Sequence, residues 1–228
     1  CTCSNFDIAL RKQIKRCNIN INNLETRIIN AINSNAYDKL VKIDFNSLNN
    51  SIFVGTGGSF AGAKFASKLI NYLYGINTMA LYPRDLYYRN NNSVDSVFLF
   101  TYSGTTNDLL VGASLIDKNN KYIITKGELQ KIVTKTGISK NNVISYRTGT
   151  NKGKERGFLS FEGALAPASL FLKLYFEKRS RNDIEEFIRE SISYWKNYFD
   201  KYFKENKKIL KEFLKEGVGF NIFTGDFT

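Results

Sequence analysis

Short apolar runs alternate with segments of helical periodicity through the middle of this chain. The runs at residues 51–54, 78–82, 95–102, 121–125 and 142–146 have the length and composition of β-strands. Between these runs, apolar positions recur at helical spacing in residues 60–74, 107–116 and 129–134. Strands separated by helices are joined by right-handed crossovers, which place them parallel in one sheet. The pattern therefore predicts an α/β fold of three layers, α/β/α, around a five-stranded parallel sheet.

The segments that flank this unit also have a helical pattern. Residues 22–40 predict one helix before the sheet, and residues 159–176 predict a largely buried apolar helix that contains Pro167. Residues 181–215 fit one long amphipathic helix or two, and residues 220–226 repeat the apolar-strand-and-glycine pattern of residues 53–55. The first residue is Cys rather than Met, which we interpret as a fragment or a processed chain. We expect a helical lead-in (1–50), an α/β domain (51–180), a helical connection (181–219) and the first strand of a truncated second domain (220–228).

Charge and hydropathy narrow the choice of partner. The 228 residues include 33 Lys and Arg against 21 Asp and Glu, a formal charge of +12. Many of the lysines lie in residues 178–215, where they alternate with acidic residues, whereas a nucleic-acid footprint is a segregated basic stripe. No apolar run reaches the roughly 18 residues of a membrane span, and the start lacks a secretory signal pattern. We therefore expect no nucleic-acid or membrane partner and a cytoplasmic location.

Cysteine and histidine usage limits the chemistry. The three cysteines, Cys1, Cys3 and Cys17, are too few and too close together for a disulfide framework, so we expect reduced thiols. One C-x-C pair supplies too few ligands for a metal, and we expect neither a metal nor a cofactor. Histidine is absent, which excludes Ser-His-Asp and Cys-His relays within this segment. Proton transfer must therefore use a carboxylate, lysine, tyrosine or cysteine.

Glycine and hydroxyl residues gather in two short loops, each placed after an apolar run and before a helical segment. Residues 55–59 read Gly-Thr-Gly-Gly-Ser, and residues 101–106 read Thr-Tyr-Ser-Gly-Thr-Thr. A helix that begins directly after a strand offers free backbone N–H groups and a positive dipole end, which together bind anions. Either loop alone also fits an ordinary helix N-cap. The pair favours a site for a phosphorylated small molecule, because ligands of open α/β sheets bind beyond the carboxyl ends of the strands.

Two other phosphate motifs fit less well. A dinucleotide-binding G-x-G-x-x-G that starts at Gly55 would need glycine where Phe60 stands, although Asp85 follows the second predicted strand as a ribose-binding acid would. Residues 149–155 resemble a P-loop but have one residue too few between the glycines and Glu155 in place of Ser or Thr. A dinucleotide-binding domain remains an alternative, whereas residues 149–155 are better explained as a loop.

Residues 101–108 (T-Y-S-G-T-T-N-D) resemble the S-x-S-G-x-T-x-[DE] phosphate loop of the sugar isomerase (SIS) family. Residues 57–59 (G-G-S) are similar to the family's G-T-S, and residues 155–160 (E-R-G-F-L-S) to its E-x-G-V-A-S. The similarity covers residues 51–176 and is greater to the first half of tandem-SIS proteins such as the isomerase part of glucosamine-fructose-6-phosphate aminotransferase. It implies a flavodoxin-like sheet order. Tyr102 stands where many relatives have Gln, and Gly58 where they have Thr.

The same resemblance implies a set of ligand contacts and a partner. The expected phosphate-binding residues are Ser59, Thr101, Ser103, Gly104, Thr105 and Thr106. The sugar would lie near Gly57, Gly58 and Ser160. The implied ligand is an amino-sugar or hexose phosphate, and the implied assembly is a homodimer.

The resemblance leaves the catalytic role open. In some single-SIS isomerases a glutamate at the start of the last helix is the base, and Glu162 falls in a similar place. An acid in a first helical turn also complements the helix dipole, and in tandem relatives the catalytic Glu and Lys belong to the second half and the C-terminal tail. We therefore expect part of a sugar-phosphate isomerase or of an aminotransferase-type isomerase. The alternative is a phosphosugar-sensing module that binds without turnover.

Overall fold

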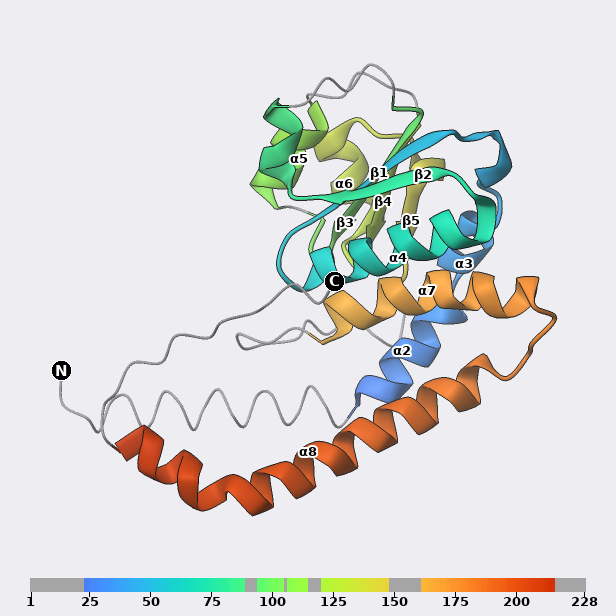
Figure 1. Ribbon diagram of the computed structural model, residues 1–228. Helices are drawn as coiled ribbons and strands as arrows, with labels where there is room; N and C mark the ends of the chain where they lie inside the picture. Colours follow the sequence, from blue (N-terminus) through green and yellow to red (C-terminus); the bar gives the residue numbers. More distant parts are fainter. Residues whose placement is uncertain (1–22, 89–93, 105, 115–119, 148–160, 216–228) are drawn as a thin grey trace. The chain divides into compact units, whose positions relative to one another are not determined.

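A five-stranded parallel sheet forms the centre of the fold (Figure 1). The computed structural model describes residues 23–88, 94–104, 106–114, 120–147 and 161–215. The strands are β1 (Asn50–Gly55), β2 (Asn77–Leu81), β3 (Ser96–Thr101), β4 (Lys121–Thr125) and β5 (Val143–Ser145). Their order is β2-β1-β3-β4-β5, and every neighbouring pair is parallel. This is the flavodoxin-like order, so the predicted parallel α/β sheet is confirmed.

Helices cover both faces of the sheet. One face carries α4 (Gly58–Tyr74) and α7 (Glu162–Lys178), which pack against each other, and α2 (Leu24–Ile32) packs on α7 (Figure 1). The other carries α5 (Asn107–Ser114), α6 (Leu129–Thr136) and the 3₁₀ turn η2 (Pro83–Tyr88). The remaining elements are α3 (Asn35–Leu40), η1 (Phe45–Ser47), η3 (Lys140–Asn142) and α8 (Ile184–Lys215). The predicted α/β/α layering is therefore confirmed.

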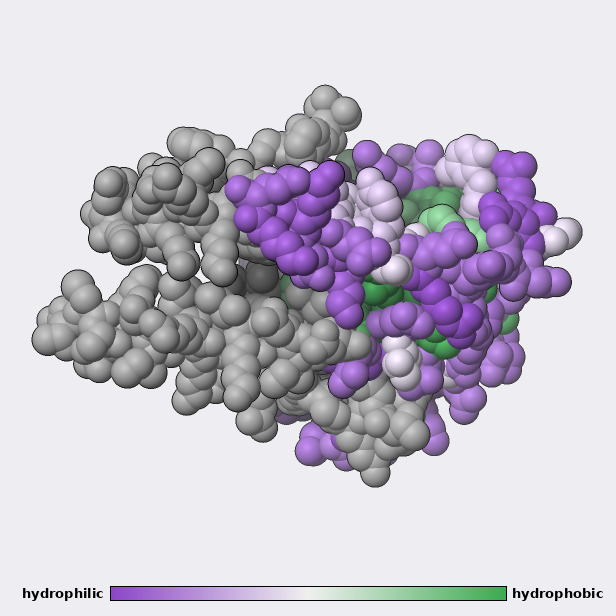
Figure 2. All heavy atoms as spheres, turned by 90° about the horizontal axis from the view of Figure 1, so that it is seen from below, coloured by the Kyte–Doolittle hydropathy of each residue, from purple (hydrophilic) through white to green (hydrophobic). Residues whose placement is uncertain are grey.

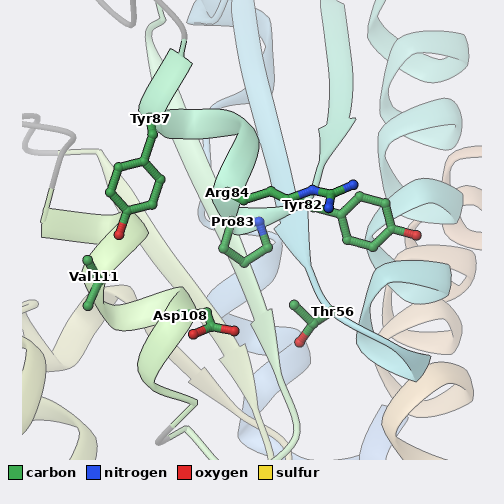
Figure 3. Close-up of a pocket in the computed structure, with 7 residues that line it drawn as sticks. All are labelled: Thr56, Tyr82, Pro83, Arg84, Tyr87, Asp108 and Val111. Atoms are coloured by element: carbon green, nitrogen blue, oxygen red, sulfur yellow. The ribbon is translucent and has the colours of Figure 1, made fainter.

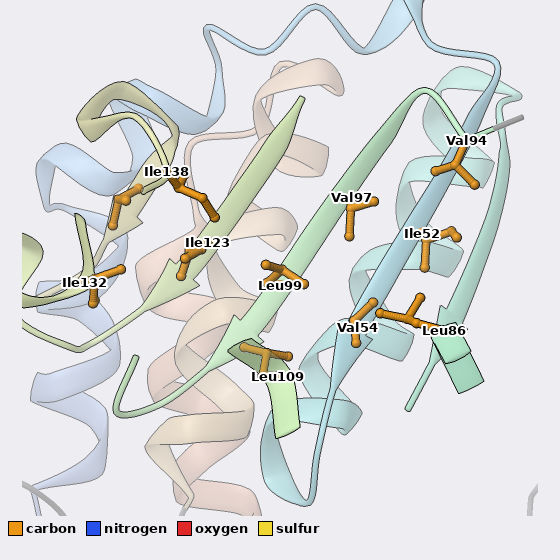
Figure 4. Close-up of a cluster of buried hydrophobic side chains, with 11 residues drawn as sticks. Ile52, Val54, Leu86, Val94, Val97, Leu99, Leu109, Ile123, Ile132 and Ile138 are labelled. Carbon is orange, nitrogen blue, oxygen red and sulfur yellow. The ribbon is translucent and has the colours of Figure 1, made fainter. Parts of the chain in front are cut away.

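Successive strand residues point to opposite faces, and the two faces carry different cores. On the α5 and α6 side, aliphatic residues such as Val54, Leu99 and Ile123 pack in one cluster with Leu109 and Ile132 (Figure 4). On the α7 side, the core is aromatic.

The aromatic core ties α7 to the sheet. The Phe53 ring of β1 stacks on Phe98 of β3 with ring centroids 4.7 Å apart, and its centroid is 6.2 Å from that of Phe171 of α7. Because β1 and β3 are buried on both faces, they read as continuous apolar runs.

Two helical predictions can be refined. The segment predicted as one helix over residues 22–40 is instead two helices, because the chain breaks at Asn33 and Ser34. The Ser34 hydroxyl accepts a hydrogen bond from the Ala36 N–H and so caps α3. Pro167 is the sixth residue of α7, and α8 is one continuous helix.

The chain divides into two compact units after Ile188, so α8 begins in the first unit and continues through the second. Ile184 and Ile188 are buried within the first unit. On the face drawn in Figure 2, hydrophilic residues cover most of the described surface, with small hydrophobic patches between them. Within the described ranges, no helix is both long and apolar enough to cross a bilayer.

Candidate functional site

The two glycine and hydroxyl loops leave neighbouring strands at the same edge of the sheet. Gly55, the last residue of β1, pairs with Phe100 of β3. In this strand order, β1 and β3 flank the point where the direction of the crossovers reverses. Open α/β sheets bind ligands in the crevice at that point. The structure thus brings together the two loops that the sequence placed far apart.

The first loop makes a tight turn into α4. A Cβ atom at Gly55 would lie 2.8 Å from the Ser59 carbonyl oxygen, and Gly57 has a positive φ of 54°. The backbone N–H groups of Ser59 and Phe60 donate back to Thr56 and Gly57 at 3.1 and 3.0 Å. Ser59 is therefore buried in the first turn of α4, beside its N-terminus.

The second loop folds back on the end of β3. The hydroxyl of Thr101, which is buried, accepts a hydrogen bond from the Gly104 N–H at 3.2 Å and lies 3.2 Å from the Thr106 hydroxyl. Gly104 has a φ of 73°. This turn places the Thr106 side chain directly before α5, as the phosphate-loop resemblance implies. Thr105, also predicted to bind phosphate, lies outside the described residues.

A third segment, the turn after β4, supports the second loop. Thr101 of β3 pairs with Thr125 of β4, whose hydroxyl donates to the Tyr102 carbonyl at 3.4 Å and accepts from the Gly127 N–H at 2.8 Å. The Ser145 hydroxyl of β5 donates to the Gly127 carbonyl at 3.1 Å. Side-chain hydroxyls on two adjacent strands, β4 and β5, thus fix the turn that lies beneath the loop.

A buried charged cluster lies beside the second loop. The Glu162 carboxylate, at the start of α7, is fully buried, and its Oε2 lies 2.7 Å from Lys126 Nζ. The Tyr102 hydroxyl donates to the same oxygen at 3.1 Å, and Arg27 Nε of α2 is 3.5 Å from it. The side chains of Lys126 and Arg27 are 4% and 15% exposed, so the cluster is largely desolvated. A buried carboxylate persists in a protein only when such partners compensate its charge.

Sequence reasoning found one acidic member of this cluster and missed both cations. Glu162 was predicted from its place at the start of the last helix in the family resemblance, whereas Lys126 and Arg27 were not predicted. Lys126 directly follows a buried strand, as Tyr102 does, and that position was the available signal. Arg27 lies on a helix outside the sheet and gives no comparable signal.

Some predicted contacts cannot be placed. Ser160 lies outside the described residues. Gly57 and Gly58 form the turn and the first residue of α4. Among residues the structure describes, no group of three or more His, Cys, Asp or Glu could hold a metal ion.

A pocket of ≈ 410 Å³ opens next to the first loop, lined by Thr56 and by residues of η2 and α5. Figure 3 shows Tyr87 and Val111 on one side of it and Tyr82 with Arg84 on the other. Asp108, the acidic residue of the phosphate-loop motif, also lines it. The pocket shares no lining residue with the Glu162 cluster, and its volume is within the range of small-molecule sites.

The positions that a dinucleotide site would need have other uses. The ring of Phe60, where the third glycine would stand, stacks on Tyr82 with centroids 4.0 Å apart. The Asp85 carboxylate accepts the Tyr82 backbone N–H at 3.0 Å and so holds the η2 turn.

Comparison with solved structures identifies the fold. The chain superposes on glucosamine-6-phosphate deaminase from Thermotoga maritima with a TM-score of 0.52 and 16% identity. The superposition on the C-terminal domain of glucosamine-fructose-6-phosphate aminotransferase from Francisella tularensis has a TM-score of 0.54 and 20% identity. The superposition on a proposed phosphosugar isomerase from Silicibacter pomeroyi has a TM-score of 0.56 and 12% identity. The chain has the SIS fold.

The chain resembles these proteins in its fold and only weakly in its sequence. The three superpositions cover 80%, 77% and 78% of the chain and 56%, 52% and 54% of the other structures. The chain thus spans about half the length of these proteins. No family model and no curated protein sequence matches the chain. Its site must therefore be interpreted from its own residues.

Proposed function

We propose that this SIS domain binds a sugar phosphate, an amino-sugar or hexose phosphate, as a homodimer in the cytoplasm. The observation that chiefly supports the proposal is that β1 and β3 are paired, so the loops that carry Ser59 and Thr106 leave the sheet at the same edge. Backbone N–H groups at the starts of α4 and α5, with the hydroxyls of Ser59, Thr101, Ser103 and Thr106, would hold the phosphate. Thr105, Gly104 and the sugar-side residues Gly57, Gly58 and Ser160 complete the proposed site.

We further propose that the domain contributes to ketose–aldose isomerisation, with Glu162 as the base. Isomerisation moves a proton between neighbouring carbons and needs one group that accepts and returns it. The chain has no histidine, and Glu162 is the fully buried carboxylate beside the second loop. Lys126 Nζ and Arg27 Nε lie 2.7 and 3.5 Å from its Oε2, so two cations compensate the charge of the buried carboxylate.

A sensing module that binds without turnover is the second candidate. The observation that favours it is the burial of Glu162, whose Oε2 already accepts from Lys126 and Tyr102. A base must reach a substrate carbon-bound proton, whereas a carboxylate that only fixes neighbouring side chains need not.

Thermal-shift measurements test the binding proposal. Fructose 6-phosphate, glucose 6-phosphate and glucosamine 6-phosphate should raise the Tm of the wild type, since a ligand that binds only the folded state stabilises it. NAD should not. Ser103→Ala should reduce the shift, while Ser114→Ala, which removes a hydroxyl bonded only to its own helix in the described contacts, should not. A wild type stabilised by NAD alone, or an unchanged shift in Ser103→Ala, contradicts the proposal.

The same ligands distinguish the two candidate roles. If Glu162 is the base, the wild type interconverts fructose 6-phosphate and glucose 6-phosphate or the corresponding amino-sugar pair. Glu162→Gln then abolishes turnover but retains measurable binding, because the amide oxygen can still accept hydrogen bonds from Tyr102 and Lys126. A wild type that binds these sugar phosphates without turnover supports the sensing role instead. Coupled assays of each product, run beside the thermal shifts, give both readings on one sample.

A further inference from the structure

Lys126 is a buried lysine that no motif explains. Its side chain is 4% exposed, and it directly follows β4 in the turn beneath the second loop. Removing a lysine from water costs several kcal/mol unless a partner compensates it. Replacing a buried ion pair with apolar residues of similar size is often neutral or stabilising, so stability alone is a weak reason to keep one.

The turn that carries Lys126 is in direct contact with the second loop. A Cβ atom on Gly127 would overlap the Ser103 carbonyl and approach the Ile132 side chain at 2.8 Å. The Thr125 hydroxyl donates to the Tyr102 carbonyl. A shift of the Lys126 backbone would therefore move the loop.

The side chain of Lys126 reaches the same loop by a second route. Its ammonium lies 2.7 Å from Glu162 Oε2, 3.5 Å from the Tyr102 hydroxyl and 5.6 Å from the centroid of the Tyr102 ring. Tyr102 is the half-buried residue between Thr101 and Ser103, two of the proposed phosphate contacts. The carboxylate of Glu162 accepts the Tyr102 hydroxyl, so ammonium, carboxylate and phenol form one connected unit.

We propose that Lys126 is a positioning residue of the ligand site, which acts through Glu162 and the Tyr102 hydroxyl to hold the second loop in its binding shape. This inference rests on the proposed function. The buried ion pair holds the loop rigid, so the hydroxyls and N–H groups of the loop need no rearrangement when phosphate binds.

Four variants test the link. Lys126→Met removes the ammonium but keeps much of the side-chain length, and Lys126→Arg restores the charge. Tyr102→Phe removes only the hydroxyl that joins the loop to Glu162. Lys126→Met with Glu162→Gln removes both charges of the pair, in case the single change leaves a carboxylate that the fold cannot tolerate.

Two control variants match the chemistry at a distance from the loop. Lys173→Met removes another partly buried lysine of the first unit, which donates to the Ile32 carbonyl at 3.1 Å and lies 4.3 Å from the Tyr37 ring centroid. Tyr72→Phe removes a phenolic hydroxyl that accepts a hydrogen bond from the Arg179 guanidinium at 2.7 Å. Both alter side-chain packing or stability without touching the loop.

Calorimetric titration of the full chain with fructose 6-phosphate, glucosamine 6-phosphate and inorganic phosphate gives the readout, beside circular dichroism for folding. We expect Lys126→Met, or the double variant if the single one does not fold, to weaken binding by about tenfold, because a small displacement of binding groups is costly. Lys126→Arg should recover most of that loss. Tyr102→Phe should weaken binding by about tenfold, as expected for a lost hydrogen bond to a charged group. Both controls should bind as the wild type does.

The outcomes separate this inference from the proposed function. If the wild type binds none of the three probes, the proposed function fails and the inference fails with it. If the wild type binds them and the folded Lys126 and Tyr102 variants bind equally well, the inference fails and the proposed function stands. Equal losses in Lys126→Met and Lys173→Met also overturn it, because a general loss of stability would then explain both.

Discussion

At the scale of single residues, Gly104 occupies a position where any other residue would meet two problems: a left-handed backbone and a lack of space for a Cβ atom. Its φ is 73°, and an added Cβ would lie 2.5 Å from Ile132 Cδ1. Gly75, the C-cap of α4, has a φ of 70° but an added Cβ there would meet nothing within 4 Å. Substitutions at Gly75 therefore report the cost of backbone strain alone, and substitutions at Gly104 report backbone strain together with overpacking.

We predict that Gly104→Ala lowers the free energy of unfolding by about 2–4 kcal/mol, from the left-handed backbone and the clash combined. Gly75→Ala should cost about 1 kcal/mol from the backbone alone. Urea unfolding of both variants measures the difference. Gly104→Ala should also reduce the thermal shift with fructose 6-phosphate, and equal losses of stability in the two variants would contradict the clash.

Single residues also show where sequence reasoning reaches its limit. The hydroxyls of Ser59, Thr101 and Thr106 could be predicted, because they follow apolar runs in a recognisable order. The partners of Glu162 could not, because Lys126 lies 36 residues away and the pairing depends on how α7 packs on the sheet. A local pattern predicts which strand a residue follows but not which side chain it will meet.

At the scale of elements, the turn between β4 and α6 is linked to solution pH through Glu128. The Lys131 ammonium, which donates to Glu128 at 2.9 Å, lowers the pKa of that carboxyl, and Arg147 at 3.7 Å adds to the effect. A carboxyl whose pKa is lowered on folding stabilises the folded state above its unfolded pKa and loses that effect as the pH falls through its folded value.

We therefore predict that Glu128→Gln lowers the Tm slightly near pH 7, and that the difference from the wild type disappears as the pH falls below 4.5, the ordinary value for this carboxyl. The effect is small because the pair is exposed to solvent. Tm measurements at pH 7 and at roughly pH 3 test it. Glu190→Gln, at an exposed position of α8 beyond its first turn, is the control. A Glu128→Gln difference that persists in acid would argue against the ion pair.

Elements also show why boundaries are harder to predict than patterns. The apolar spacing of residues 22–40 continues across the break at Asn33 and Ser34, so periodicity alone favours one helix. Ser34 is a favoured N-cap, yet a serine within a helical pattern signals a cap only if the chain turns there. The turn lets α2 pack on α7 and α3 on β5, which is a tertiary requirement.

At the scale of the whole molecule, every described residue of the proposed site belongs to the first compact unit, residues 1–188. We predict that a chain ended after Ile188 folds and shows the same thermal shift with fructose 6-phosphate as the full chain. A chain ended after Lys178 should be less stable, because it lacks the buried side chains of Ile184 and Ile188. Circular dichroism measures the folding of each shortened chain, and thermal shift measures its response to the ligand. Loss of the ligand response in the chain that ends after Ile188 would place part of the site beyond residue 188.

Local patterns in the sequence are enough to predict the parallel α/β sheet, its five strands and the two glycine and hydroxyl loops. These follow from periodicity and from glycine and hydroxyl residues, which act through local backbone geometry. The pairing of the strands that carry the loops, and the convergence of Lys126, Arg27 and Tyr102 on Glu162, are seen only in the folded chain. The physical reason is that buried charges are tolerated only in mutual contact, and that contact is made by packing α2 and α7 against the sheet rather than by neighbours along the chain.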